Sequence, residues 1–393
     1  MGNQVGPVVD KTTTYGETDI LHYACCEMQG WRETMEDASL CKEVQLIDKT
    51  VGVFGVFDGH GGPLISKFVA SNFIDLLKKS YEEDKENKDH NESLNNVIVK
   101  SFLSLDEMLQ QNEVNEFLKE LHNKIKSHQE SFDFKFTNIP NSSSFSSLKH
   151  PSLSTTDSSN LSKKSTETHN SSSISSSVES VEDKTIADSK KKYAELFKKR
   201  DLIARNMGTT ANIIILENNY FYVANAGDSL AVVYKNRTAI RLNTEHKPSL
   251  ISEEERIAKA GLKIINNRIE GRLNLSRAIG DLCFKSNSKL KPYEQAVTCY
   301  PEINKYKITD DMEFIVMGCD GIWDCVDIQK FCSHISLELK IGIKTPSEII
   351  SSLMDNLISR TKECKSNLKT PPIAPIGTDN MTCTLLVFKD QRK

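Results

Sequence analysis

Residues 51–62 of the 393-residue chain read Val-Gly-Val-Phe-Gly-Val-Phe-Asp-Gly-His-Gly-Gly. The apolar run predicts a buried strand, and it stops abruptly at Asp58 and a glycine-rich turn. Two later strand-like runs end in the same way, at Asp228 and Asp320, and Asp379 stands at the start of a final one. An Asp at a strand end is usually a turn residue. Four of them on apolar strands predict carboxylates gathered at one edge of a sheet.

Carboxylates that lie close together raise one another's pKa, and a divalent cation relieves that repulsion. Oxygen ligands without grouped His or Cys favour a hard ion such as Mg²⁺ or Mn²⁺. Glu36, Asp37 and Asp281 are candidates to extend this acidic site. Arg32, four residues before Glu36, is suited to clamp a phosphate beside two metals. For Arg277, a structural ion pair and a ligand contact stay open as alternatives.

The remaining pattern predicts the α+β class, with many antiparallel strands and a few helices. Apolar periodicity predicts a helix over 64–79 and a helical region over about 94–126. Two hairpins are predicted over 210–226 and 230–242, with asparagines at their tips. Further strands are predicted over 313–319 and 381–388. Capping boxes at Ser252–Glu255 and Thr345–Glu348 predict two helix starts.

Composition shifts sharply in the middle of the chain. From Ser142 to Ser180, 18 of 39 residues are serine, and such a segment buries too little apolar surface to offset the entropy of ordering it. We expect a disordered insert at about 138–189, which interrupts a single domain over 21–393. Residues 1–20 are expected to form an N-terminal tail.

Charge and cysteine content exclude several classes of protein. Lys and Arg number 50 against 54 Asp and Glu, a net charge of −4, so the basic surface typical of nucleic-acid binding is absent. None of the ten cysteines forms a Cys-x-x-Cys pair, which favours free thiols in a reducing compartment. Cys26 and Arg32 have the bare spacing of a cysteine-dependent phosphatase loop. Such a loop needs small residues, so that its backbone N–H groups can all point at the phosphate. Glu27 and Trp31 lie within these positions and therefore disfavour this type of phosphatase.

Seven motifs resemble, in order, those of the metal-dependent type 2C protein serine/threonine phosphatases, from about Tyr23 to Phe388. They are Trp31-Arg32 with Met35-Glu-Asp37, Asp58-Gly-His-Gly-Gly62, Gly208-Thr-Thr-Ala211, Asn225-Ala-Gly-Asp-Ser229, Ser276-Arg-Ala-Ile-Gly-Asp281, Asp320-Gly-Ile-Trp-Asp324 and Asp379-Asn-Met381. The resemblance implies two packed antiparallel β-sheets flanked by α-helices, a four-layer α-β-β-α sandwich with metals at one end. One departure is Ser39, where several members have His.

By motif position, the resemblance implies a set of site residues. Asp58 would bridge two Mg²⁺ or Mn²⁺ ions, and Asp228 with Asp320 matches a weaker third site. Arg32 and Arg268 would hold phosphate, His60 would be the general acid, and Asp37 and Asp281 would support the ligands. The implied metal ligands are Glu36 (through water), Asp58, Gly59 (through its carbonyl), Asp228, Asp320 and Asp379.

The implied function is hydrolysis of phosphoserine and phosphothreonine in proteins by a metal-bridging hydroxide. The alternative from another class is a non-catalytic scaffold that binds phosphoproteins, which the complete set of acidic residues disfavours. Phosphoproteins rather than nucleic acids are the expected partners, and the oligomeric state stays open. Met1-Gly2-Asn3 permits N-myristoylation, although Gly6 stands where Ser or Thr is usual. We expect a cytoplasmic protein, with the nucleus left open and membrane contact only if Gly2 is acylated.

Overall fold

A computed structural model of the chain describes residues 6–86, 93–127, 201–358 and 377–389. The predicted Ser-rich insert at about 138–189 and the candidate acylation site Gly2 lie outside the described residues. The described residues on both sides of the insert belong to one unit that spans 1–139 and 201–393. Among the described helices, none combines the length and apolarity needed to cross a bilayer.

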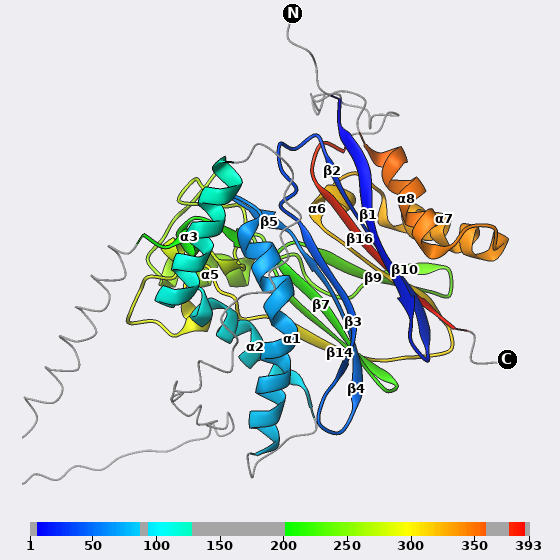
Figure 1. The fold of residues 1–393 in the computed structure, drawn as a ribbon, viewed down its shortest axis with the longest axis horizontal. Helices are drawn as coiled ribbons and strands as arrows, with labels where there is room; N and C mark the ends of the chain where they lie inside the picture. The colour runs from blue at the N-terminus through cyan, green and yellow to red at the C-terminus, as the bar shows by residue number, and fades with distance from the viewer. Residues whose placement is uncertain (1–5, 87–92, 128–200, 359–376, 390–393) are drawn as a thin grey trace, which may run out of the picture. The chain divides into compact units, whose positions relative to one another are not determined.

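Two antiparallel sheets lie face to face at the centre of this unit (Figure 1). Within the described residues, the first sheet has six strands in the order β1-β2-β16-β15-β9-β10. They are β1 (Val8–Glu17), β2 (Leu21–Gly30), β16 (Met381–Phe388), β15 (Met312–Gly318), β9 (Leu230–Lys235) and β10 (Thr238–Arg241). The second has five described strands in the order β14-β8-β7-β4-β3. They are β14 (Glu302–Lys307), β8 (Tyr220–Ala226), β7 (Ala211–Glu217), β4 (Thr50–Phe57) and β3 (Ala38–Gln45).

Helices cover the outer faces of both sheets (Figure 1). On the five-stranded sheet, α1 (Leu64–Lys85) packs against β3 and β4, with α2 (Asn95–Met108) and α3 (Asn112–Ser127) against α1. On the six-stranded sheet, α7 (Ile328–Ile341) packs against β10, and α8 (Pro346–Leu357) against β2 and β16. One buried cluster includes Met28, Phe54, Val232 and Ile350, and so joins both sheets to α8. The predicted four-layer α-β-β-α sandwich is confirmed.

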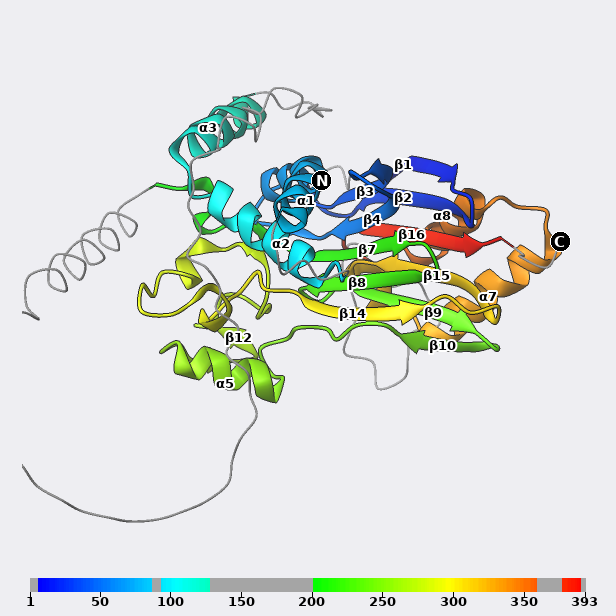
Figure 2. The same ribbon diagram turned by 90° about the horizontal axis from the view of Figure 1, so that it is seen from below.

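Short elements complete the described part of the fold, with α5 and β12 away from α7 (Figure 2). They are β5 (Gly59–His60), β6 (Gly208–Thr209), α5 (Ile251–Lys259), β11 (Ile264–Ile265), β12 (Arg268–Ile269), β13 (Ile279–Gly280), α6 (Asp320–Trp323) and the 3₁₀ helices Ile203–Arg205, Leu282–Phe284 and Pro292–Glu294. The strands β13, β6 and β5 form a small sheet in that order.

Local sequence chemistry explains the hairpins and the start of α8. Asn218 turns β7 into β8 with φ of 50°, and Asn236 turns β9 into β10 with φ of 49°. Asparagine tolerates this left-handed conformation better than most residues. At the start of α8, the Thr345 backbone N–H donates to Glu348 Oε2 at 2.8 Å, and the Glu348 N–H donates to Thr345 Oγ1 at 3.3 Å. Both predicted hairpins and this capping box are confirmed.

Two local predictions were wrong. Residues 8–17, expected in a tail, form the edge strand β1, which pairs antiparallel with β2. Because the β1 side chains are almost all exposed, no apolar alternation marked the strand. The helix α5 begins at Ile251 after Leu250, without a side-chain cap. Ser252 therefore lies inside its first turn and is not the predicted cap.

Candidate active site

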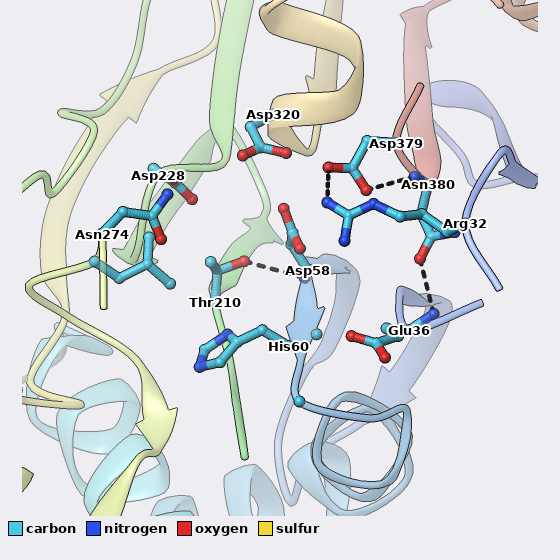
Figure 3. A pocket seen from close by; sticks show the side chains of 13 residues that line it. Arg32, Glu36, Asp58, His60, Thr210, Asp228, Asn274, Asp320, Asp379 and Asn380 are labelled. Carbon is cyan, nitrogen blue, oxygen red and sulfur yellow. Dashed lines mark hydrogen bonds and ion pairs between the residues drawn. The ribbon is translucent and has the colours of Figure 1, made fainter. Parts of the chain in front are cut away.

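The four strand-end aspartates meet at one edge of the two sheets (Figure 3). The strand β7 runs antiparallel to both β4 and β8, so β4 and β8 end at the same edge. In the other sheet, β16 starts beside the end of β15. One carboxylate oxygen each of Asp58, Asp228 and Asp320 lies within 4.8 Å of the other two. Asp379 lines the same cavity, so the structure brings the four aspartates together.

The carboxylates of the cluster have raised pKa values, because they are buried and close to one another. Burial raises the pKa of the Asp58 carboxyl well above its usual range, and the charges of Asp37 and Asp320 raise it further. Burial and repulsion from Asp228 raise the pKa of Asp320 to about 7. A set of oxygen donors with so much unbalanced negative charge fits a hard divalent cation, which favours the ionised form of each carboxylate.

Asp37 lies behind Asp58, away from solvent. It is 3% exposed, and its Oδ2 accepts a hydrogen bond from Thr382 Oγ1 at 2.7 Å. Burial raises its pKa to about 7. One carboxylate oxygen of Asp37 also lies within 4.8 Å of a ligand atom of Asp58 and of Cys319. Asp58 therefore belongs to both groups of closely spaced ligand atoms.

Asn380 connects Asp379 to the loop that carries Arg32 and Glu36. Its backbone N–H donates to Asp379 Oδ1 at 2.7 Å, and its Oδ1 accepts from the Glu36 N–H at 2.9 Å. Its Nδ2 donates to the Gln29 carbonyl at 2.7 Å. The Arg32 Nη2 forms an ion pair with Asp379 Oδ2, drawn in Figure 3. Arg32 and Glu36 both line the cavity.

Gly59 is held where no side chain would fit. A Cβ on Gly59 would clash with the Glu36 carbonyl oxygen and lie 2.8 Å from Ser66 Oγ. Ser66 Oγ itself donates to that carbonyl. The close approach of the two backbones brings Gly59 and Glu36 to the same wall of the cavity.

His60 is paired with Asp281, with His60 Nε2 at 2.7 Å from Asp281 Oδ2. Burial disfavours the charged imidazolium, but the Asp281 carboxylate outweighs it and raises the pKa of His60 above its ordinary value. A Cβ on Gly208 would clash with Asp281 Oδ2 and lie 2.9 Å from His60 Nε2. The pair therefore requires the glycine of β6. The carboxyl of Asp281 thus supports His60 rather than the acidic cluster.

The two other candidate arginines do not reach the cavity. Arg268 lies in β12, where its Nη1 donates to the Arg272 carbonyl at 2.9 Å, and it is absent from the cavity lining. The structure therefore does not bring Arg268 to the site, and its role in phosphate binding stays a prediction. The Arg277 Nη2 pairs with Glu253 Oε1 at 2.7 Å, so the structural ion pair is the correct alternative for Arg277.

The geometry also rules out the cysteine-dependent phosphatase loop. Cys26 is fully buried in β2, and burial raises the pKa of its thiol. A nucleophilic cysteine needs a lowered pKa and access to substrate.

Several residues at the cavity were not predicted from the sequence. Thr210, Asn274, Leu275 and Asn380 line it, and Thr210 Oγ1 accepts from the Asp58 N–H at 3.1 Å. Lys247 forms an ion pair with Asp228. Asn380 follows Asp379 directly, so its position was a usable signal. Nothing local in the sequence pointed to Lys247.

Replacing Glu253 with glutamine should destabilise the fold strongly. Glu253 is 1% exposed and pairs with both Arg256 and Arg277. In the variant, the two arginines would keep their positive charges but lose the carboxylate that neutralises them. Removing one partner of a buried ion pair costs about 3–5 kcal/mol, which we expect as a fall of roughly 10 °C in Tm by calorimetry. In the control Glu255→Gln, on the same helix with a 64% exposed side chain, Tm should change by less than about 2 °C.

The pH dependence tests the same ion pairs. Burial favours the neutral acid, but Arg277 and Arg256 outweigh it and hold the pKa of Glu253 at about 2, against an ordinary 4.5. A lowered carboxyl pKa stabilises the fold above about pH 4.5 and loses this contribution as the pH falls toward 2. The difference in unfolding free energy between wild type and Glu253→Gln should be constant from pH 7 to 5 and smaller at pH 4. An unchanged difference at pH 4 in urea titrations would contradict the assignment.

Curated relatives match the chain over almost its whole length. "Probable protein phosphatase 2C 3" of Paramecium tetraurelia is 33% identical over 387 residues, covering 98% of this chain and 97% of the relative. "Probable protein phosphatase 2C 58" of Oryza sativa subsp. japonica is 32% identical over 390 residues, covering 98% of this chain and 88% of the relative.

Solved structures share the fold. A serine-threonine phosphatase 2C from Toxoplasma gondii matches with a TM-score of 0.58 at 15% identity, covering 97% of this chain and 100% of that chain. A second phosphatase, from a pathogenic strain of Toxoplasma gondii, matches with a TM-score of 0.59 at 18% identity, covering 97% and 96%. At these identities the similarity concerns the fold alone.

The family model of protein phosphatase 2C matches residues 21–127 and 119–366. These ranges contain six of the seven motifs, all but Asp379-Asn-Met381, and all of the cavity-lining residues except Asp379 and Asn380. With the relatives and the four-layer fold, the match establishes that the chain belongs to the protein phosphatase 2C family of serine/threonine protein phosphatases.

Proposed function

We propose that the chain hydrolyses phosphoserine and phosphothreonine side chains by direct attack of water on phosphorus, in the cavity beside Asp58. The observation that carries this proposal is the crowding of Asp58, Asp228 and Asp320, with ligand atoms within 4.8 Å. Two Mg²⁺ or Mn²⁺ ions, with Asp228 offering a weaker third position, would supply Lewis acidity that makes water a nucleophile near neutral pH. No cysteine nucleophile is then needed, in keeping with the burial of Cys26.

Arg32 binds and orients the phosphate in this proposal. Its side chain is 57% exposed and lines the cavity, while the ion pair with Asp379 fixes the direction of the guanidinium. A planar guanidinium offers paired donors that match phosphate oxygens. Asn380 strengthens this placement, since it ties the Arg32 loop to Asp379 through Glu36 and Gln29.

His60 supplies the proton that the leaving serine or threonine oxygen requires. It lines the cavity beside Asp58, and its pairing with Asp281 favours the protonated imidazole. A positioned acid of this kind protonates the leaving alkoxide as its bond to phosphorus breaks.

Phosphate release from a phosphothreonine peptide tests the proposal. The purified full-length chain should release inorganic phosphate in the presence of Mn²⁺, stop when excess chelator removes the ion, and recover when Mn²⁺ is restored. Release that persists in chelator would contradict metal dependence. Binding of the phosphopeptide in Mn²⁺ without any release would instead favour the scaffold alternative.

A further inference from the structure

A lysine of the chain reaches the candidate metal ligands. Lys247 Nζ forms an ion pair with Asp228 Oδ2, with the lysine side chain 36% exposed and the aspartate 3% exposed. Asp228 also belongs to the group of ligand atoms that it forms with Asp58 and Asp320. One carboxylate therefore faces both an ammonium of the chain and the position of a divalent cation.

Backbone contacts between the preceding residues hold Lys247 and Asp228 next to each other. The His246 N–H donates to the Gly227 carbonyl at 2.9 Å, and the Gly227 N–H donates to His246 Nδ1 at 3.3 Å. Lys247 and Asp228 are the next residues after this reciprocal pair. The backbone contacts of the preceding residues therefore position the ion pair between Lys247 and Asp228.

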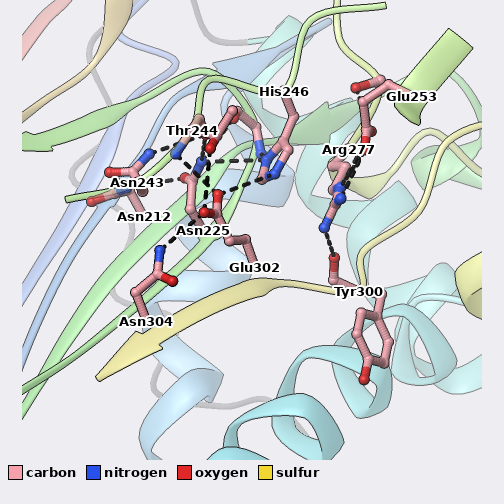
Figure 4. Close-up of polar contacts among 12 residues, drawn as sticks. Asn212, Asn225, Asn243, Thr244, His246, Glu253, Arg277, Tyr300, Glu302 and Asn304 are labelled. Carbon is pink, nitrogen blue, oxygen red and sulfur yellow. Dashed lines mark hydrogen bonds and ion pairs between the residues drawn. The ribbon is translucent and has the colours of Figure 1, made fainter. Parts of the chain in front are cut away.

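Buried asparagines strengthen the same connection (Figure 4). Asn225 Nδ2 donates to the Gly227 carbonyl at 2.9 Å and to the Thr244 carbonyl at 2.8 Å. Asn243 Nδ2 donates to the Ser229 carbonyl at 3.0 Å. These bonds join the segment before Lys247 to the residues on either side of Asp228.

We propose that Lys247 is a tethered cation that competes with a divalent ion for Asp228. At low ion concentration the ammonium neutralises Asp228, and at high concentration a divalent ion displaces it. Lys247 would thereby lower the affinity of the weakest metal position, the one that Asp228 would help to hold. This inference rests on the proposed metal-dependent function.

The charge of Lys247 predicts the size of the effect. A unit positive charge within about 5 Å of a divalent ion opposes its binding by at least about tenfold, even at the dielectric constant of water. Lys247→Met keeps the length of the side chain and removes this charge. The affinity for the weakest Mn²⁺ ion should therefore rise by at least about tenfold, while Lys247→Arg should resemble wild type.

Calorimetric titration of metal-free full-length protein with Mn²⁺ tests the inference without an activity readout. The matched control is Lys49→Met, since Lys49 is also a partly buried lysine paired with an acid, but that acid, Glu217, does not belong to the acidic cluster. It should bind Mn²⁺ as wild type does. In Asp228→Asn the weakest site should disappear, which identifies it.

Unchanged or weaker binding at that site in Lys247→Met would overturn the role of Lys247. Persistence of the weak site in Asp228→Asn would overturn it equally, since the ion would then bind elsewhere. Absence of any Mn²⁺ binding in wild type would instead overturn the proposed metal-dependent function, so the two failures are distinguishable.

Discussion

Replacing Asp58 with asparagine should abolish phosphate release from a phosphothreonine peptide. Asp58 belongs to both groups of residues whose ligand atoms lie close enough together to hold a metal ion. One group contains Asp228 and Asp320, and the other contains Asp37 and Cys319. Loss of an outer partner of a metal ligand already costs about 10–100-fold in affinity or activity. Loss of the shared ligand should lower kcat by more than this factor of about 10–100, in a steady-state assay at saturating Mn²⁺.

The same substitution should leave the metal-free fold intact. Burial and neighbouring charges raise the pKa of Asp58 well above its usual range, so its ionised form destabilises the apo protein near neutral pH. Asparagine removes that charge, and Tm measured in chelator should be unchanged or higher. The control Asp355→Asn, at an exposed carboxylate paired with Lys11, should keep full turnover. Normal turnover of Asp58→Asn in saturating Mn²⁺ would contradict the assignment of Asp58.

The strand ends were predictable because their signal is local. The apolar run of β4 stops at Asp58 and that of β15 near Asp320, and a carboxylate cannot continue a buried strand without a partner. Because β4 and β8 are both antiparallel to β7, which lies between them, they end at the same edge. The residues alone thus predict the gathering of the four aspartates, whereas the four-layer sandwich was predicted from the resemblance to a known family.

Contacts between distant segments were not predictable in this way. Arg32 pairs with Asp379, 347 residues away, and Lys247 reaches Asp228 because His246 pairs with Gly227. Periodicity reports which face of an element is buried, and it carries no information about such pairs. For the same reason the motif position of Arg268 did not show that its side chain lies outside the cavity.

Replacing His60 with alanine should slow hydrolysis of a phosphothreonine peptide by about 10²–10⁴-fold, the usual contribution of a general acid. The threonine oxygen leaves as a strongly basic alkoxide unless it is protonated. The nitrophenolate of p-nitrophenyl phosphate leaves readily without a proton, so its hydrolysis should slow much less. The ratio of kcat for the two substrates, measured at saturating Mn²⁺, is the test.

Two variants separate acid catalysis from other roles of this region. Arg32→Ala should raise KM for both substrates by similar factors, because Arg32 would hold the phosphate common to them. Asp281→Asn should show the His60→Ala pattern more weakly, since it removes the carboxylate 2.7 Å from His60 Nε2 and keeps the imidazole. Calorimetric Mn²⁺ affinity should stay near that of wild type in His60→Ala, which excludes loss of metal as the cause. If His60→Ala slows the peptide and p-nitrophenyl phosphate by the same factor, His60 organises the turn around Asp58 and is not the acid.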